Sequence, residues 1–242
     1  MIRVRVPETP AQGEVLTLDE DQSHHLRSVL RVRSGEAVTA LSAEGTRWRC
    51  EVIEVSSPVQ LRVLGADEGP DANPEGSLEV NMALLKGGKT DDLIRQLTEL
   101  GASSIVVYTS QRCVARLDPK KAEKKLARWR TIAEESTRQC DRTDPPTVGF
   151  HEGLPPGGDH HVFLWEEAPV EPCTRETMTQ VVGDGRLTLL VGPEGGLEPA
   201  EARELVSRGW RQSSLGPRVM RAETAVVAAA VLALVALGER GY

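Results

Sequence analysis

The stretch Leu189-Leu190-Val191-Gly192-Pro193-Glu194-Gly195-Gly196 decides the fold of the C-terminal part of this 242-residue chain. An apolar strand runs into a glycine-rich turn, and Pro199 marks a helix start just after it. In open α/β sheets, ligands bind beyond the carboxyl ends of the strands, and glycines there let the backbone approach a ligand closely. The turn matches neither a phosphate-binding P-loop nor the G-x-G-x-x-G fingerprint. It predicts a small-molecule site without naming the ligand, although alone it is more typical of a tight strand-to-helix turn.

A second loop rich in Gly and Pro, LGPRVMRAETA, spans residues 215–225. It carries Arg218 and Arg221 and runs straight into a helix that is apolar nearly all round, which must therefore be buried. The many alanines of that helix allow close backbone approach, as in a tight core or a subunit interface. A surface ion pair would account for Arg218, whereas a functional role is favoured for Arg221, close to Glu223.

Strands and helices alternate from Leu78 onward, which predicts an α/β domain with a largely parallel sheet. Thr90 is expected to cap a helix that Gly101 ends, and Asp118 is expected to cap a long helix with Pro119 at its first position. The other expected strands lie at 78–85, 104–109, 161–165 and 186–191, and the other expected helices near 171–182, 198–208 and 223–237.

The first 64 residues show a different pattern, with short alternating or β-branched segments at 2–6, 36–41, 48–55 and 59–64. One helix is expected around 19–30, and the whole predicts a small β-barrel-like domain. Residues 65–77, GADEGPDANPEGS, have the composition of a linker. We therefore expect an N-terminal domain over residues 1–70 and a second domain over 71–242.

Composition excludes several classes of protein. A net charge of −7 argues against a wholly basic nucleic-acid coat protein. The four cysteines lie far apart without a C-x-x-C pair, so no zinc ribbon or other metal site is expected, and a reducing, cytoplasmic setting is the default. The N-terminus has no apolar leader, and the longest apolar run, 225–237, is too short to span a membrane.

Five motifs, in order along the chain, resemble the RsmE family of ribosomal RNA methyltransferases, members of the SPOUT (trefoil-knotted) superfamily. They are His25-Leu26 with Val29-Leu30-Arg31 and Gly35, TELG at 98–101, Gln139-Cys140 with Arg142 and Pro146, GPEGG at 192–196, and LGPRVMRAETA at 215–225. The chain departs from the family at Gln96, where many members have Lys, which weakens any role for a lysine there. Ala222 stands where Thr is common in the family, and Leu197 stands where an aromatic residue is frequent. Both differences are interpreted as packing changes.

The resemblance implies a C-terminal α/β trefoil-knot domain, an N-terminal PUA-like RNA-binding barrel, and a homodimer whose active site lies near the subunit interface. It also implies methylation of N3 of a uridine in 16S rRNA within the assembled small subunit, with S-adenosylmethionine bound bent in the knot and contacted mainly by backbone. The matching cofactor positions are Leu164, Glu166, Gly192, Pro193, Glu194, Gly195, Gly196, Leu215, Gly216, Val219, Met220 and Arg221.

Methylation of N3 requires that its proton be removed or its anion stabilised. Arginine stays protonated, so Arg221 and Arg142 are expected to act electrostatically. Glu223 or Glu194 could take the proton, and the sequence does not decide between them. A carboxylate at a helix start also favours the helix dipole, which is an equally good explanation for Glu223.

Local positive charge identifies candidate RNA contacts inside the acidic chain. Residues 112–142 hold ten basic and five acidic side chains, which could be a solvated helix face or a phosphate-binding surface. The low aromatic content favours recognition of shape and backbone over base stacking. The candidates are His25, for which packing within its helix is the simpler role, Arg27, Arg31, Arg33, Arg112, Arg138 and Arg142. The alternatives are a SPOUT enzyme acting on tRNA or a ribose 2′-OH, and a non-catalytic RNA-binding assembly factor.

Overall fold

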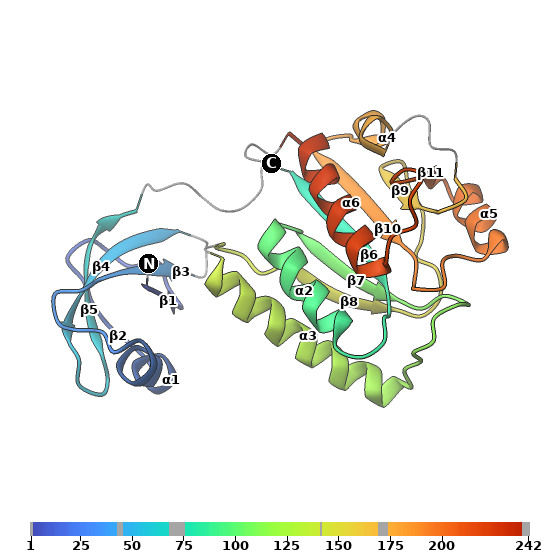
Figure 1. Cartoon of the computed structure of the whole chain (residues 1–242). Helices are drawn as coiled ribbons and strands as arrows, with labels where there is room; N and C mark the ends of the chain where they lie inside the picture. Colours follow the sequence, from blue (N-terminus) through green and yellow to red (C-terminus); the bar gives the residue numbers. More distant parts are fainter. Residues whose placement is uncertain (1, 43–45, 68–75, 141, 169–173, 239–242) are drawn as a thin grey trace. The chain divides into compact units, whose positions relative to one another are not determined.

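The computed structural model describes residues 2–42, 46–67, 76–140, 142–168 and 174–238. The chain forms two compact units, Met1–Ala72 and Asn73–Tyr242 (Figure 1). The domain boundary expected at residue 70 lies outside the described residues.

Unit 1 is a five-stranded mixed sheet in the order β1-β3-β4-β5-β2. Its strands are β1 (Ile2–Val6), β2 (Val15–Thr17), β3 (Ala37–Ser42), β4 (Arg47–Glu54) and β5 (Gln60–Ala66). The alternating residues expected to be apolar fill its core, with Val52 and Leu61 fully buried. Because β1 and β2 are edge strands with no pairing between them in the described part of the unit, the sheet is a half-open barrel.

The single helix expected near residues 19–30 is two different helical segments. Asp19 caps the short α-helix α1 (Glu20–His24), because its Oδ1 accepts a hydrogen bond from the Gln22 backbone N–H at 2.8 Å. A π-helical turn, η1 (His25–Leu30), follows directly and buries Leu26. It ends at Arg31, whose positive φ of 54° is uncommon for a residue with a side chain.

Unit 2 is an α/β domain built on a six-stranded sheet in the order β11-β9-β10-β6-β7-β8, in which every pairing is parallel. The strands are β6 (Ser77–Ala83), β7 (Ser104–Tyr108), β8 (Thr147–His151), β9 (His161–Leu164), β10 (Arg186–Val191) and β11 (Arg211–Ser213). The helices are α2 (Lys89–Leu100), α3 (Pro119–Gln139), α4 (Thr174–Val181), α5 (Pro199–Ser207) and α6 (Ala222–Ala236). The parallel α/β class is thus confirmed, while β8 and β11 were not predicted.

Helices cover both faces of this sheet (Figure 1). Leu189 and Val191 of β10 pack in one core with side chains of α2, α3, α4 and α6. Leu190, which points the opposite way, packs in a second core with Leu205 of α5. Both faces of β10 are buried toward its end, which explains why residues 189–191 are all apolar. No helix among the described residues is long and apolar enough to cross a membrane.

The two expected helix caps have different outcomes. Asp118 caps α3 as predicted, with its Oδ1 accepting from the Lys121 backbone N–H at 2.9 Å. The prediction for Thr90 was wrong, because α2 already begins at Lys89. The Thr90 hydroxyl instead accepts a hydrogen bond from the Leu85 backbone N–H at 3.2 Å, which ties the helix to the start of the preceding loop.

Candidate functional site

A pocket of about 180 Å³ lies beyond the carboxyl ends of three adjacent strands, β11, β9 and β10. Three loops and the first turn of α6 form its walls. The lining residues include Leu164–Glu166, Val191–Glu194, Gly196, Ser214–Met220, Ala222 and Ala225. The pocket therefore brings together both glycine-rich loops and the segment after β9, as the sequence predicted. Of the twelve expected cofactor positions, ten line it, while Gly195 and Arg221 are absent from its lining.

The first loop, residues 192–198, approaches the pocket through its backbone. Gly196 has a φ of 71°, a conformation that L side chains rarely adopt, and its N–H donates to the Pro193 carbonyl at 2.9 Å. A Cβ at Gly196 would collide with the Glu166 carboxylate. Only glycine leaves room at this position for the Glu166 side chain, which lines the same pocket.

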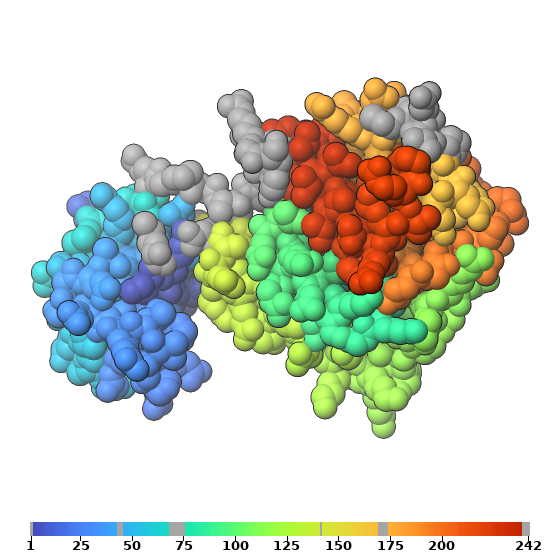
Figure 2. Space-filling model, viewed as in Figure 1, coloured from blue at the N-terminus to red at the C-terminus, as the bar shows by residue number. Residues whose placement is uncertain are grey.

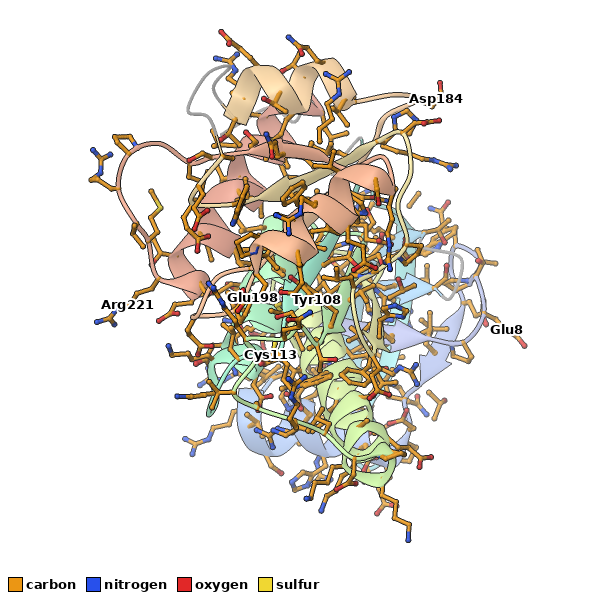
Figure 3. All side chains as sticks on the ribbon, turned by 90° about the vertical axis from the view of Figure 1, so that its right-hand side faces the viewer. Glu8, Tyr108, Cys113, Asp184, Glu198 and Arg221 are labelled. Carbon is orange, nitrogen blue, oxygen red and sulfur yellow. The ribbon has the colours of Figure 1, made fainter. Side chains whose placement is uncertain are left out.

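The last residue of β7 and the segment after it hold the first loop in place. The buried Tyr108 hydroxyl donates to the carbonyl of Val191 at 3.2 Å, and burial raises the pKa of Tyr108 well above its ordinary value, so the hydroxyl stays a donor. Arg112 donates to the Gly195 carbonyl at 3.0 Å and to Glu198 Oε1 at 2.7 Å. Figure 3 labels Tyr108 and Glu198, which lie toward the centre of that view.

The second loop, residues 215–221, is far more exposed. Val219 has 88% of its surface accessible, and the side chains of Arg218 and Arg221 are also exposed. In Figure 3 the Arg221 side chain points away from the protein, at the outer edge of this loop. Gly216 has a φ of 105°, yet a Cβ there would meet nothing within 4 Å. This wall of the pocket is held by few contacts.

Both glutamates considered as proton acceptors contact the same lysine. Lys89 Nζ lies 3.2 Å from Glu223 Oε1 and 3.7 Å from Glu194 Oε1. The backbone N–H of Glu223 itself is the first cause that lowers its pKa, and Lys89 and Arg221 lower it further. Glu223 is therefore a carboxylate, rather than a carboxylic acid, at neutral pH.

Sequence reasoning missed Lys89, although a signal for it was present. It follows Lys86-Gly87-Gly88, a short glycine-containing loop after the predicted strand 78–85. The rule that ligands bind at the carboxyl ends of strands applies to this loop as well as to GPEGG. The wall expected over residues 164–166 includes Trp165, whose buried indole N–H has no hydrogen-bond partner among the described residues.

The expectation that Arg142 acts in the site is not supported within one subunit. Its side chain is buried, and its guanidinium donates to the carbonyls of Thr98 and Ala102, both at 2.9 Å. Ala102 precedes β7, so Arg142 lies at the amino edge of the sheet, opposite the pocket. Its guanidinium satisfies carbonyls at the end of α2 rather than meeting RNA.

The other candidate RNA contacts are exposed and are divided between the two units. His25, Arg27, Arg31 and Arg33 lie on or just after η1 in unit 1. Arg112 lies beside the pocket in unit 2, and Arg138 is in the last turn of α3. Arg112 is already engaged with the first loop.

Comparisons with known proteins agree with this geometry. Residues 72–234 match a family described as RNA methyltransferase domain, and residues 18–64 match one described as RNA methyltransferase PUA domain. The chain is 31% identical to the ribosomal RNA small subunit methyltransferase E of Bacillus subtilis, over 88% of this chain and 87% of that protein. It is 32% identical to the Mycobacterium bovis protein of the same name, over 91% and 86%. The chain belongs to the ribosomal RNA small subunit methyltransferase E family.

Solved structures with a bound cofactor share the fold of this chain. The Neisseria gonorrhoeae ribosomal RNA small subunit methyltransferase E, bound to S-adenosyl methionine, is 25% identical with a TM-score of 0.79 and coverage of 96% and 95%. A putative methyltransferase of Legionella pneumophila in complex with the same cofactor is also 25% identical, with a TM-score of 0.73 and coverage of 96% of each chain.

Proposed function

We propose that this protein transfers the methyl group of S-adenosylmethionine to N3 of a uridine in 16S rRNA. The observation that carries the proposal is the pocket at the carboxyl edge of the sheet, formed by the same two loops that carry the family motifs. Its residues suit this cofactor. Leu164, Leu215 and Met220 offer apolar walls, Glu166 offers an acceptor for hydroxyl groups, and the glycines leave backbone groups accessible.

The cofactor supplies an activated methyl group, so the protein has to align it, exclude water and prepare the nucleophile. We assign the GPEGG loop, the second loop and residues 164–166 to holding the cofactor. Arg221 stabilises negative charge on the target base or its phosphate. Arg142 acts only indirectly, by holding the end of α2.

Further parts of the proposal concern partners. The N-terminal unit, with His25, Arg27, Arg31 and Arg33 exposed around η1, binds the rRNA together with Arg138. A small-subunit substrate places the reaction in the cytoplasm. The half-buried apolar side chains in the C-terminal half of α6, including Val231 and Leu232, support a homodimer. On this face of unit 2, α6 lies beside α2 (Figure 2).

The test combines cofactor binding with product analysis. Calorimetry should detect S-adenosylmethionine binding, and whole small subunits should be methylated in preference to naked 16S rRNA and tRNA. Nucleoside analysis should then identify 3-methyluridine. Methylated tRNA or a 2′-O-methyl product would establish the alternative enzyme. A protein that binds rRNA, but neither binds S-adenosylmethionine nor transfers a methyl group, would be an assembly factor.

A further inference from the structure

A second hollow, of about 540 Å³, lies between the first turns of α2 and α6. Its polar lining consists of Lys89, Asp92, Gln96, Glu223 and Thr224. Leu93 and Val227 give it an apolar floor. A nucleobase binds where apolar side chains contact its ring and a few polar groups face its edge.

The Lys89–Glu223 ion pair stands at the border between this hollow and the cofactor pocket. Glu223 directly follows Ala222, which lines the cofactor pocket, while Glu223 itself lines the hollow. Lys89 Nζ also reaches Glu194 on the cofactor side, at 3.7 Å. Lys89 is 40% exposed and the Glu223 side chain 28% exposed, so both groups remain accessible to a ligand.

The pair presents a hydrogen-bond donor and an acceptor next to each other. Lys89 offers ammonium N–H groups, and Glu223 offers carboxylate oxygens 3.2 and 3.3 Å away. The imide edge of uracil has the complementary order, a carbonyl acceptor next to the N3–H donor. Cytosine has an unprotonated N3 that cannot donate to a carboxylate. Cytosine can still pair with this donor and acceptor through N3 and its amino group, so the ion pair selects uracil only by placing the carboxylate at a protonated N3.

We infer that Lys89 and Glu223 together bind the imide edge of the target uridine, with Lys89 donating to a carbonyl oxygen and Glu223 accepting from N3–H. This inference rests on the proposed function and adds the residues that read the base. It also chooses between the two glutamates. Glu223 lines the hollow, whereas Glu194 lines the cofactor pocket and accepts the backbone N–H of Lys86 at 3.3 Å.

The reaction then balances without another reactant. The N3 proton passes to the Glu223 carboxylate, and the electron pair left on N3 forms the new N–CH3 bond. The bond between methyl and sulfur breaks, and its electrons stay on sulfur. Lys89 stabilises the negative charge that develops on the carbonyl oxygen, and Glu223 afterwards releases its proton to solvent.

Charged groups on three elements surround the pair. Asp92 on α2 lines the same hollow, Glu194 on the first loop lies 3.7 Å from Lys89 Nζ, and Arg221 is close enough to lower the pKa of Glu223. The lowered pKa of Glu223 keeps it an acceptor at neutral pH. An acceptor is what the imide N–H needs.

The test of Lys89 uses single-turnover methylation of small subunits from cells that lack this protein. Lys89→Met should lower the rate about 100-fold, the typical loss for one donor at a developing oxyanion. Lys89→Arg should recover at least about tenfold of that loss, since it restores a cation. Affinity for S-adenosylmethionine should stay within about twofold in both. Lys86→Met is the matched control, because this exposed lysine keeps its backbone N–H bond to Glu194 and should act as wild type.

The test of Glu223 is the slope of rate against pH. The wild-type rate should be flat between about pH 6 and 9, because the carboxylate is ionised throughout. Glu223→Gln should be slower and should rise about tenfold per pH unit, because N3 must then lose its proton to solvent. A flat profile for Glu223→Gln, or a Lys89→Met rate above about half of wild type, overturns the inference. If the wild-type protein binds the cofactor but leaves small subunits unmethylated, the proposed function itself fails, and the inference falls with it.

Discussion

The two loops that wall the cofactor pocket differ in how firmly the fold holds them. The first, residues 192–198, is fastened by Tyr108, Arg112 and a capping box at the start of α5. The second, residues 215–221, is exposed, with Val219 88% accessible. Segments with few buried contacts open and reorder at low free-energy cost. The first loop is therefore held in place by the fold itself, while the second loop can change conformation when the cofactor and RNA bind.

The largest expected effect comes from the exposed loop. Arg221→Ala should lower the methylation rate by about 100- to 1000-fold, because a cation near the developing charge is lost. The unfolding free energy should stay within about 0.5 kcal/mol of wild type, since the side chain is exposed. Cofactor binding, measured by calorimetry, should survive.

Arg211→Ala is the control for this prediction, because Arg211 is an equally exposed arginine in β11. It should retain the wild-type rate. Near-normal turnover by Arg221→Ala would show that the exposed loop carries no chemistry and only closes the pocket.

An effect of intermediate size is expected when one glycine of each loop is replaced by alanine. Gly196→Ala and Gly216→Ala should each destabilise the fold by about 1–2 kcal/mol, because both positions have positive φ. Only the methyl group at 196 collides with Glu166, which can move only by leaving its place in the pocket. Calorimetry should therefore show S-adenosylmethionine binding at least about tenfold weaker for Gly196→Ala than for Gly216→Ala. Equal losses would mean that Glu166 contributes nothing to cofactor binding.

The sequence predicted the firmly held features better than the long-range ones. Leu189–Val191 followed by Gly192 identified the buried strand and its turn, because both signals are local. The three polar residues of β11, RQS, carry no periodic signal, and the strand was missed. Its existence depends on β9, which supplies its pairing partners.

Charged side chains were the hardest to place from sequence. The Lys89–Glu223 contact joins residues 134 positions apart, which only the folded topology brings together. Arg142 looked like one more member of a basic surface, yet it is buried against the carbonyl groups of Thr98 and Ala102. Composition gives the charge of a segment but does not tell which charge pairs internally.

The smallest expected effect tests the brace of the first loop. Arg112→Ala removes the bonds to Gly195 and Glu198, but the Arg112 side chain is 38% exposed, so solvent screening should keep the loss of stability small. S-adenosylmethionine should bind about threefold more weakly. Arg138→Ala is the matched comparison, because Arg138 is an exposed arginine at the end of α3, far from the first loop in sequence.

Arg112→Ala and Arg138→Ala should differ in how their RNA affinity depends on salt concentration. A lost phosphate contact reduces the slope of log affinity against log salt by about one. Arg138→Ala should show this reduction with normal cofactor affinity, and Arg112→Ala should show the reverse. A reduced slope together with normal cofactor affinity in Arg112→Ala would place Arg112 on the RNA surface. The first loop would then depend on Tyr108 and the capping box alone, and the two walls of the pocket would differ less than their contacts indicate.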